Sequence, residues 1–515
     1  MPFTAPLLLI GFVPLLLSVE SIIESGANKK DRKVFWLCLT TFFIWNTSCI
    51  YWVFNSFISA GMSVWVATLI ALIPFGLAAL LMAIAFLFYY KLRRVISPVW
   101  AYTGLICFWI GYEFLHQSWD LAFPWMTLGN GFATTHQLIQ WYEYTGVYGG
   151  TLWIWLSNIL IFELYKSVKN TSQNKLKLSI ATILVIALPV SVSLFIYNNY
   201  VEKSNPANVV VVQPNIDPYL KWNSPTFMQV QQLITLSQSV AQPNTEYFIW
   251  PETGMPESVN EEKIRSNVNY IQVHDFLNNY KNGNVISGIS SYLLYDHAKT
   301  PTATFQKQFG NKYLDYFNAA VQIENSQKVQ FYHKSKLVPG PEQLPFATAL
   351  AFMKPIFASF GGSSGGFGRQ DEPSVFYSQS GIGVSPVICY ESIWGEWIAK
   401  SVTKGSQFIA IVTNDGWWGN TSGKDQHFDY AKLRAIETRR WVARSANTGI
   451  SGFINQRGDV VKKTSWWVPA AVKQDINLND KLTVYVQYGD VIAFAGCFGS
   501  GFFLLLMITG PLKKR

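Results

Sequence analysis

Residues 383–392 read GVSPVICYES, an apolar run rich in small and β-branched residues that stops at Cys389. Tyr390 and Glu391 follow at once, so a thiol stands where a buried strand gives way to a polar segment. The other four cysteines lie in long apolar stretches, where cysteine behaves as a small hydrophobic residue. Cys389 is therefore either a packing residue or a nucleophile, and the rest of the chain has to decide.

Runs of the same kind recur between residues 205 and 488 and alternate with polar and amphipathic stretches. We expect strands at 208–213, 246–250, 284–290, 318–324, 329–335, 381–389, 407–414 and 449–455. We expect helices between them at 226–241, 260–280, 391–404 and 425–446. Alternating strands and helices predict an α/β domain whose strand ends carry the chemistry.

The composition places much of the remaining chain in a membrane. Half of the 515 residues are hydrophobic and only 14% are charged, against about 25% in soluble proteins. Seven apolar runs are long enough to cross a bilayer, at 4–23, 34–58, 64–90, 98–116, 141–165, 177–197 and 489–510. We therefore expect a multi-span α-helical membrane domain in 1–200, with about six spans. A catalytic domain should follow in 201–488, then a last span with a basic tail in 489–515.

Positive charge predicts the orientation of these spans. Much of the net charge of +9 lies in short clusters after the first, third, fifth and last spans. Such clusters favour the cytoplasmic side, which leaves residues 201–488 and the N-terminus outside. This pattern indicates membrane topology rather than nucleic-acid binding. We expect Glu113 and Glu143, in or beside spans, to lie at an interface or to hydrogen-bond to a neighbouring helix.

Three expected strand ends carry reactive side chains. Glu252 follows one run within WPETGMP (250–256), Lys334 ends another, and Cys389 ends the third. A glutamate can take the proton of a thiol, and a lysine can stabilise the oxyanion that forms after thiolate attack. The six histidines are scattered and no CxxC pair occurs, so we expect neither a metal site nor a cofactor.

These segments resemble the Glu–Lys–Cys site of the nitrilase superfamily, which has an αββα sandwich fold and acts on carbon–nitrogen bonds or acyl groups. With its membrane spans, the whole chain resembles the apolipoprotein N-acyltransferases of bacterial inner membranes. The matching stretches are FPWMTLGN (123–130), VQPNIDPYLKW (212–222), WPETGMP (250–256), YFNAA (316–320), YHKSKLVPGPEQLP (332–345), CYES (389–392), TNDGWWG (413–419) and RSANTGISG (444–452).

The resemblance implies a role for each matched residue. Glu252 corresponds to the general base, Lys334 to the oxyanion-stabilising lysine and Cys389 to the acyl-accepting nucleophile. The residues expected to support them are Glu342, Tyr390 and Glu391. The residues expected to bind substrate are Trp222, Asn318, Trp417 and Trp418. For Trp417 and Trp418, packing in the core or anchoring at the membrane interface stays an equal alternative. One departure from the family is Pro341, which stands where glycine is usual before the second glutamate.

The implied reaction moves a fatty acyl chain from a phospholipid, typically phosphatidylethanolamine, to the α-amine of the S-diacylglyceryl cysteine of an apolipoprotein. It would proceed in ping-pong order through a cysteine thioester, in a monomer of the bacterial inner membrane with its catalytic domain on the periplasmic side. The family has one more span than we count, so a preceding span is expected to be missing. Two alternatives stay open: a membrane-anchored nitrilase-type amidase acting on a small substrate, and a non-enzymatic membrane scaffold.

Overall fold

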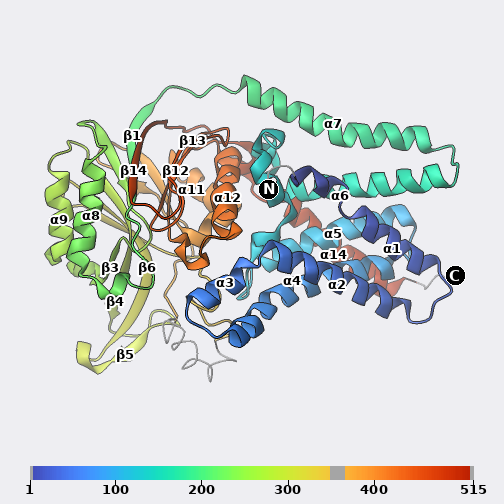
Figure 1. The fold of residues 1–515 in the computed structure, drawn as a ribbon, viewed down its shortest axis with the longest axis horizontal. Coiled ribbons are helices and arrows are strands. Elements are labelled where there is room, and N and C mark those ends of the chain that lie inside the picture. Colours follow the sequence, from blue (N-terminus) through green and yellow to red (C-terminus); the bar gives the residue numbers. More distant parts are fainter. Residues whose placement is uncertain (1–3, 348–365, 511–515) are drawn as a thin grey trace. The chain divides into compact units, whose positions relative to one another are not determined.

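The computed structural model describes residues 4–347 and 366–510 (Figure 1). The chain divides into two compact units. The first, here called the helical unit, comprises Met1–Tyr200 and Tyr488–Arg515. The second, here called the sandwich unit, comprises Val201–Gln487.

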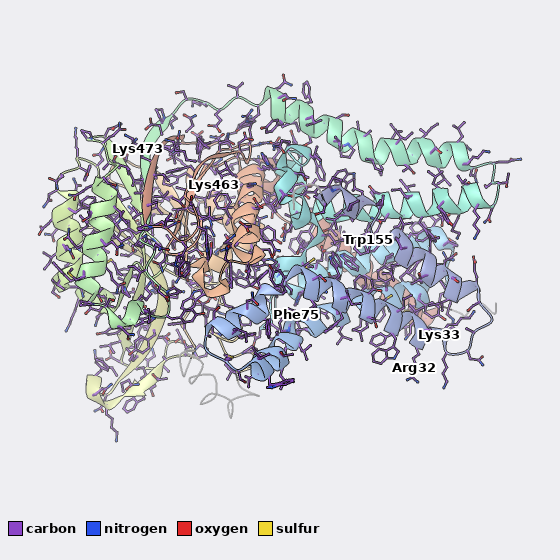
Figure 2. The ribbon with its side chains drawn as sticks, in the orientation of Figure 1. Arg32, Lys33, Phe75, Trp155, Lys463 and Lys473 are labelled. Carbon is purple, nitrogen blue, oxygen red and sulfur yellow. The ribbon has the colours of Figure 1, made fainter. Side chains whose placement is uncertain are left out.

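The helical unit is a bundle of apolar helices. A short 3₁₀ helix, Ala5–Leu9, leads into the first of them. The bundle helices are α1 (Val13–Glu24), α2 (Lys30–Cys49), α3 (Trp52–Ser59), α4 (Val64–Leu92), α5 (Pro98–His116), α6 (Tyr142–Lys169), α7 (Lys175–Asn199) and α14 (Val491–Thr509). Two 3₁₀ helices, Pro124–Met126 and Leu128–Leu138, connect α5 to α6. Phe75 and Trp155, labelled in Figure 2, are buried in this bundle.

Among the described residues, five helices are long and apolar enough to cross a membrane, or six if the bent pair α2 and α3 forms one span. The sequence predicted seven. All seven stretches are helical, but Pro98–His116 is not among the candidate spans. This helix packs against α4 and α14 and buries Glu113, so much of its surface meets protein rather than lipid. That explains how a less apolar helix fits within the bundle.

The basic clusters that follow α1, α4 and α6 gather at one end of the bundle. Arg94 lies 3.8 Å from Asp31, at the start of α2. Glu20 of α1 pairs with Arg93 at 3.0 Å and with Lys166 of α6 at 2.7 Å. Figure 2 shows Arg32 and Lys33 near the same turn between α1 and α2. The last basic cluster, residues 513–515, lies outside the described residues.

The sandwich unit contains two β-sheets. The first has the order β14-β1-β2-β4-β6-β5, with β3 on β4 and β7 on β6. Its strands are β1 (Pro206–Gln213), β2 (Thr245–Ile249), β3 (Met255–Asn260), β4 (Asn284–Tyr295), β5 (Thr304–Gln306), β6 (Lys312–Glu324), β7 (Val329–His333) and β14 (Ala470–Asn477). The second has the order β13-β12-β11-β10-β9-β8. Its strands are β8 (Phe376–Tyr377), β9 (Gly383–Ile388), β10 (Phe408–Thr413), β11 (Val442–Ala446), β12 (Gly452–Ile454) and β13 (Val460–Lys463).

Helices cover the outer face of each sheet, and the inner faces meet. Side chains of α8 (Thr226–Gln238) and α9 (Val268–Leu277) pack on the first sheet. Those of α11 (Gly395–Thr403) and α12 (Ser422–Thr438) pack on the second (Figure 1). Between the sheets, the rings of Tyr247 and Phe408 lie 5.1 Å apart. The predicted αββα sandwich is therefore confirmed, and burial on both faces explains why β1 and β9 read as continuous apolar runs.

One predicted helix is partly wrong. The expected helix 425–446 ends at Thr438, and Val442–Ala446 is instead the strand β11, paired in parallel with β10. Arg439, with φ of 49°, stops the helix in the left-handed region. The strands β3, β5, β8, β13 and β14 were not predicted from the sequence either.

Candidate active site

Cys389 stands directly after β9, at the start of a 3₁₀ helix, Cys389–Ile393. Its backbone lies in the left-handed region, with φ of 51°, which is costly for a residue with a β-carbon. The side chain is 8% exposed. Tyr390, the next residue, is also buried, and its ring meets that of Trp394 edge-on, with centroids 4.9 Å apart. A sharp turn therefore presents the thiol at the carboxyl end of a buried strand.

Glu252 occupies a second tight turn, after the end of β2. The amides of Gly254 and Gly288 both donate to the carbonyl of Pro251, at 3.0 Å each. A β-carbon at position 288 would lie 2.5 Å from the α-carbon of Glu252, so glycine is needed for β4 to approach this turn. Thr253, the next residue, has φ of 47°. The turn is thus held close to β4 in a strained form that presents Glu252.

Lys334, Glu252, Glu342 and Asn318 form one buried cluster. The ammonium of Lys334 lies 3.2 Å from Oε1 of Glu252 and 2.7 Å from Oε1 of Glu342. The amide nitrogen of Asn318 donates to the same two oxygens, at 2.9 and 2.8 Å. Asn318, expected from the family resemblance to bind substrate, therefore lies between the two carboxylates.

Electrostatics in this cluster favour a charged lysine and a protonated thiol. Burial acts to lower the pKa of Lys334, but the charges of Glu252 and Glu342 outweigh it and raise that pKa. For Cys389, burial raises the pKa, the charge of Glu252 raises it further, and Lys334 acts in the opposite direction. These interactions place the thiol within electrostatic range of both groups. A thiol held in this form needs a base before it can attack.

Glu391 ties the cysteine turn to the lysine segment. Its Oε2 accepts from the amide of Ile388, at 2.9 Å, at the end of β9. Its Oε1 accepts from the amide of Ser335 at 2.6 Å and from the hydroxyl of Tyr332 at 2.7 Å. One buried carboxylate thereby fixes the nucleophile strand and the residue after Lys334 relative to each other.

A second buried network lies behind Cys389, and the sequence did not predict it. His427 has its Nδ1 2.9 Å from Oδ1 of Asp415 and its Nε2 3.2 Å from the carbonyl oxygen of Cys389. Ser392 donates its hydroxyl to the same carbonyl at 2.8 Å. Arg444 donates to Oδ2 of Asp415 at 2.7 Å. The Asp–His–Ser order resembles a serine-hydrolase triad, but Ser392 is buried and bonded to the turn, so the network supports the cysteine backbone.

The sequence also missed Lys221, a nearly fully buried lysine beside the Glu252 turn. Its ammonium donates to the carbonyl and hydroxyl oxygens of Thr253, at 2.8 and 2.6 Å. Burial lowers the pKa of Lys221 to about 8, while the charge of Glu252 acts to raise it. Lys221 directly precedes Trp222 in the matching stretch 212–222, but the resemblance implied a role only for Trp222.

The three tryptophans expected to bind substrate lie in different surroundings. Trp222 is 57% exposed. Trp417 is half-buried and meets the ring of Tyr219 edge-on, with centroids 5.1 Å apart. Trp418 packs against His427, with centroids 5.3 Å apart. Trp222 and Trp417 are thus accessible on the loops after β1 and β10, whereas Trp418 contacts the network behind Cys389.

The two glutamates expected in or beside spans belong to the helical unit. Glu113 accepts hydrogen bonds from Trp109 and the amide of Leu128, both at 2.9 Å, and from Thr151 of α6 at 2.8 Å. It thus makes the expected bond to a neighbouring helix. Glu143 is half-buried in the first turn of α6.

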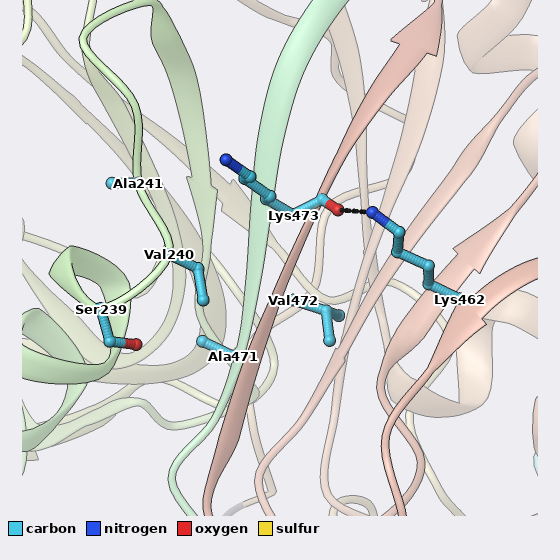
Figure 3. Close-up of a pocket in the computed structure, with 7 residues that line it drawn as sticks. All are labelled: Ser239, Val240, Ala241, Lys462, Ala471, Val472 and Lys473. Atoms are coloured by element: carbon cyan, nitrogen blue, oxygen red, sulfur yellow. Dashed lines mark hydrogen bonds between the residues drawn. The ribbon is translucent and has the colours of Figure 1, made fainter.

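An open surface groove of the sandwich unit contains none of the candidate residues (Figure 3). It is lined by Ser239, Val240, Ala241, Lys462, Ala471, Val472 and Lys473. Lys462 donates to the carbonyl of Lys473 across it, at 2.7 Å. Within 4–347 and 366–510, no group of three His, Cys, Asp or Glu side chains is arranged to hold a metal ion.

Two family profiles match the chain. The one described as Apolipoprotein N-acyltransferase N-terminal domain matches residues 1–160. The one described as Carbon-nitrogen hydrolase matches residues 208–481, more than half of the chain. The chain therefore belongs to the carbon–nitrogen hydrolase family, and its N-terminal part marks it as a member of the apolipoprotein N-acyltransferase branch.

Curated relatives extend this likeness over nearly the full length. A protein of Chlorobaculum tepidum named apolipoprotein N-acyltransferase is 28% identical, over 99% of this chain and 92% of its own. One of Geobacter metallireducens with the same name is 26% identical, over 97% and 90%. Among solved structures, a Nesterenkonia amidase of the nitrilase superfamily covers 56% of this chain and 96% of its own, at 13% identity and a TM-score of 0.37.

Proposed function

We propose that this chain is a phospholipid-dependent apolipoprotein N-acyltransferase that works through a thioester on Cys389. The observation that carries the proposal is the convergence of Glu252, Lys334 and Cys389, which follow β2, β7 and β9, in one buried site. The names of the relatives supply the reaction class. Action as a monomer is part of the proposal.

In the first half-reaction, Glu252 takes the thiol proton and the sulfur of Cys389 attacks the ester carbonyl of a phospholipid. The ammonium of Lys334 and the amide after Cys389 stabilise the oxyanion of the tetrahedral intermediate. The carbon–oxygen bond of the ester then breaks, and Glu252 returns the proton to the leaving oxygen. A lysophospholipid departs, and the acyl chain remains on sulfur.

In the second half-reaction, the α-amine of a diacylglyceryl cysteine attacks the thioester. Glu252 takes a proton from the attacking nitrogen, the carbon–sulfur bond breaks, and the thiolate of Cys389 is protonated again. Glu342 bonds Lys334, and Asn318 bonds both Glu252 and Glu342. These two residues therefore hold Lys334 and Glu252 together throughout. The complete transfer needs no reactant besides the phospholipid and the diacylglyceryl cysteine.

The membrane setting supports lipid substrates. The apolar helices of the helical unit hold the protein in a bilayer, where the acyl donor resides. The basic clusters gathered at one bundle end favour the cytoplasmic face of the inner membrane, with the catalytic domain on the periplasmic side. Phosphatidylethanolamine is the donor that the family resemblance implies. The exposed Trp222 and the half-buried Trp417 are suited to contact an acyl chain.

The test is direct detection of the intermediate. Purified full-length protein is incubated with phospholipid carrying a labelled acyl chain, digested, and examined by mass spectrometry for an acyl adduct on Cys389. We expect the adduct in the natural chain and its discharge when a diacylglyceryl peptide is added. Cys389→Ala should form none while remaining inserted in the membrane, and Cys389→Ser should be severely impaired because a hydroxyl needs a stronger base.

Two results would count against the proposal. An adduct that water discharges as fast as the peptide does would identify a hydrolase instead. Full transfer by the Cys389→Ala variant would remove the nucleophile assignment altogether.

A further inference from the structure

We infer that Lys221 is a positioning residue for acylation: by holding Thr253, it fixes the turn that presents Glu252 to the thiol. The inference rests on the proposed function. It concerns a residue outside the Glu–Lys–Cys site and assigns it to the first half-reaction. Lys221 lies in the segment after β1, thirty-two residues before the Thr253 it bonds.

The contact is short, buried and double. The ammonium of Lys221 is bonded to both side-chain and main-chain oxygens of Thr253. The side chain is 2% exposed, so water cannot take over these bonds. The carbonyl of Lys221 in turn accepts from the side-chain amide nitrogen, Nε2, of Gln229 in α8, at 2.6 Å. Lys221 is therefore fixed at both ends, to a helix and to the Glu252 turn.

The turn needs such support because its backbone is strained. Thr253 is β-branched and has φ of 47°, a conformation that such residues rarely adopt. It follows Glu252 directly, so relaxation of Thr253 would rotate the peptide that carries the base. A displacement of about 1 Å in a reacting group can cost about 100-fold in rate. Lys221 also brings a positive charge close enough to act on the charge of Glu252.

The experiment measures thioester formation with phospholipid alone, in single turnovers over a range of phospholipid concentrations. Lys221→Met removes both hydrogen bonds at similar volume. We expect its maximal acylation rate to fall about 100-fold, while the half-saturating phospholipid concentration stays within about twofold. Lys473→Met, in the groove of Figure 3 that no candidate residue lines, is the matched control and should acylate like the natural chain.

Variants of the acceptor test the same contact from the other side. Thr253→Val loses the hydroxyl, whereas Thr253→Ser keeps it and should acylate faster than Thr253→Val. Because Lys221 and Thr253 act through one contact, the double variant Lys221→Met/Thr253→Val should be no slower than Lys221→Met alone.

The outcomes separate a positioning role from a purely structural one. A Lys221→Met protein with fewer active molecules but an unchanged rate constant would show that Lys221 only stabilises the fold, and would overturn the inference. So would an unchanged maximal rate, or an additive double variant. If the natural chain forms no thioester at all, the proposed function itself fails, a result distinct from failure of the variant alone.

Discussion

Asp415 is the charged residue whose environment most clearly links the site to stability. Burial acts to raise its pKa, but Arg444 and His427 outweigh that effect and lower the pKa to about 2. A carboxyl whose folded pKa is depressed stabilises the fold above its ordinary pKa, and this contribution is lost as pH falls towards the folded value. For Asp415 the window runs from about pH 4 to about pH 2 and is worth about 2 kcal/mol.

We therefore expect Asp415→Asn to flatten the acid dependence of stability. Thermal midpoints measured between pH 5 and pH 3 should fall less steeply in the variant than in the natural chain. At pH 7 the variant should be less stable by about 3–5 kcal/mol, because Arg444 loses its buried partner. A natural chain and variant with parallel pH profiles would contradict the assignment of this titration to Asp415.

Residue chemistry explains what sequence alone could identify at the site. Glu252, Lys334 and Cys389 each follow an apolar run, so their positions at strand ends could be predicted. Arg444 could not, because a fully buried arginine in a central strand is acceptable only through its ion pair with Asp415, twenty-nine residues away. Pro341 stands where the family usually has glycine, yet Glu342 still reaches Lys334 at 2.7 Å.

At the scale of elements, the candidate site is an assembly of turns held by a few side chains. Glu391 is the clearest case, since it bonds the end of β9 and the segment after β7 at once. Glu391→Gln replaces one acceptor oxygen with a donor group, which would then face an N–H or O–H donor. We expect thioester formation on Cys389 to fall about 100-fold, as for a misplaced reacting group.

The matched control for that change is Glu396→Gln, the same substitution at a partly exposed glutamate. Glu396 lies in α11 and pairs with Lys400 on the same helix at 3.3 Å. A partly exposed pair of this kind contributes about 0.5 kcal/mol or less, so acylation should be unaffected. Equal losses in both variants, measured as rates of adduct formation, would show that Glu391 has no special bracing role.

Element boundaries show where sequence patterns stop being informative. Buried strands with β-branched runs, such as β1, β9 and β10, were predicted because both faces are apolar. The strand β11 was predicted as helix, because its two alanines and its arginine suit a helix. Its pairing with β10 and β12 makes it a strand. Pairing across the fold thus decided what local propensity could not.

At the scale of the whole molecule, the two units imply an orientation that labelling can test. We would introduce single cysteines at exposed positions: Asn28→Cys and Gln173→Cys in loops of the helical unit, and Ala298→Cys in the sandwich unit. A membrane-impermeant maleimide should reach only the Ala298→Cys site in right-side-out vesicles, and all three after permeabilisation. The unmodified chain sets the background from its own cysteines. Labelling of Asn28→Cys in sealed vesicles would reverse the proposed topology.

The first and last strands of the sandwich unit, β1 and β14, pair along their whole length, with Pro206 opposite Asn477. The chain therefore enters and leaves this sheet about one strand spacing apart, roughly 5 Å. A folded body with adjacent ends can be spliced into a single loop of a host protein. The sandwich unit is thus suited to transplantation onto a different anchor.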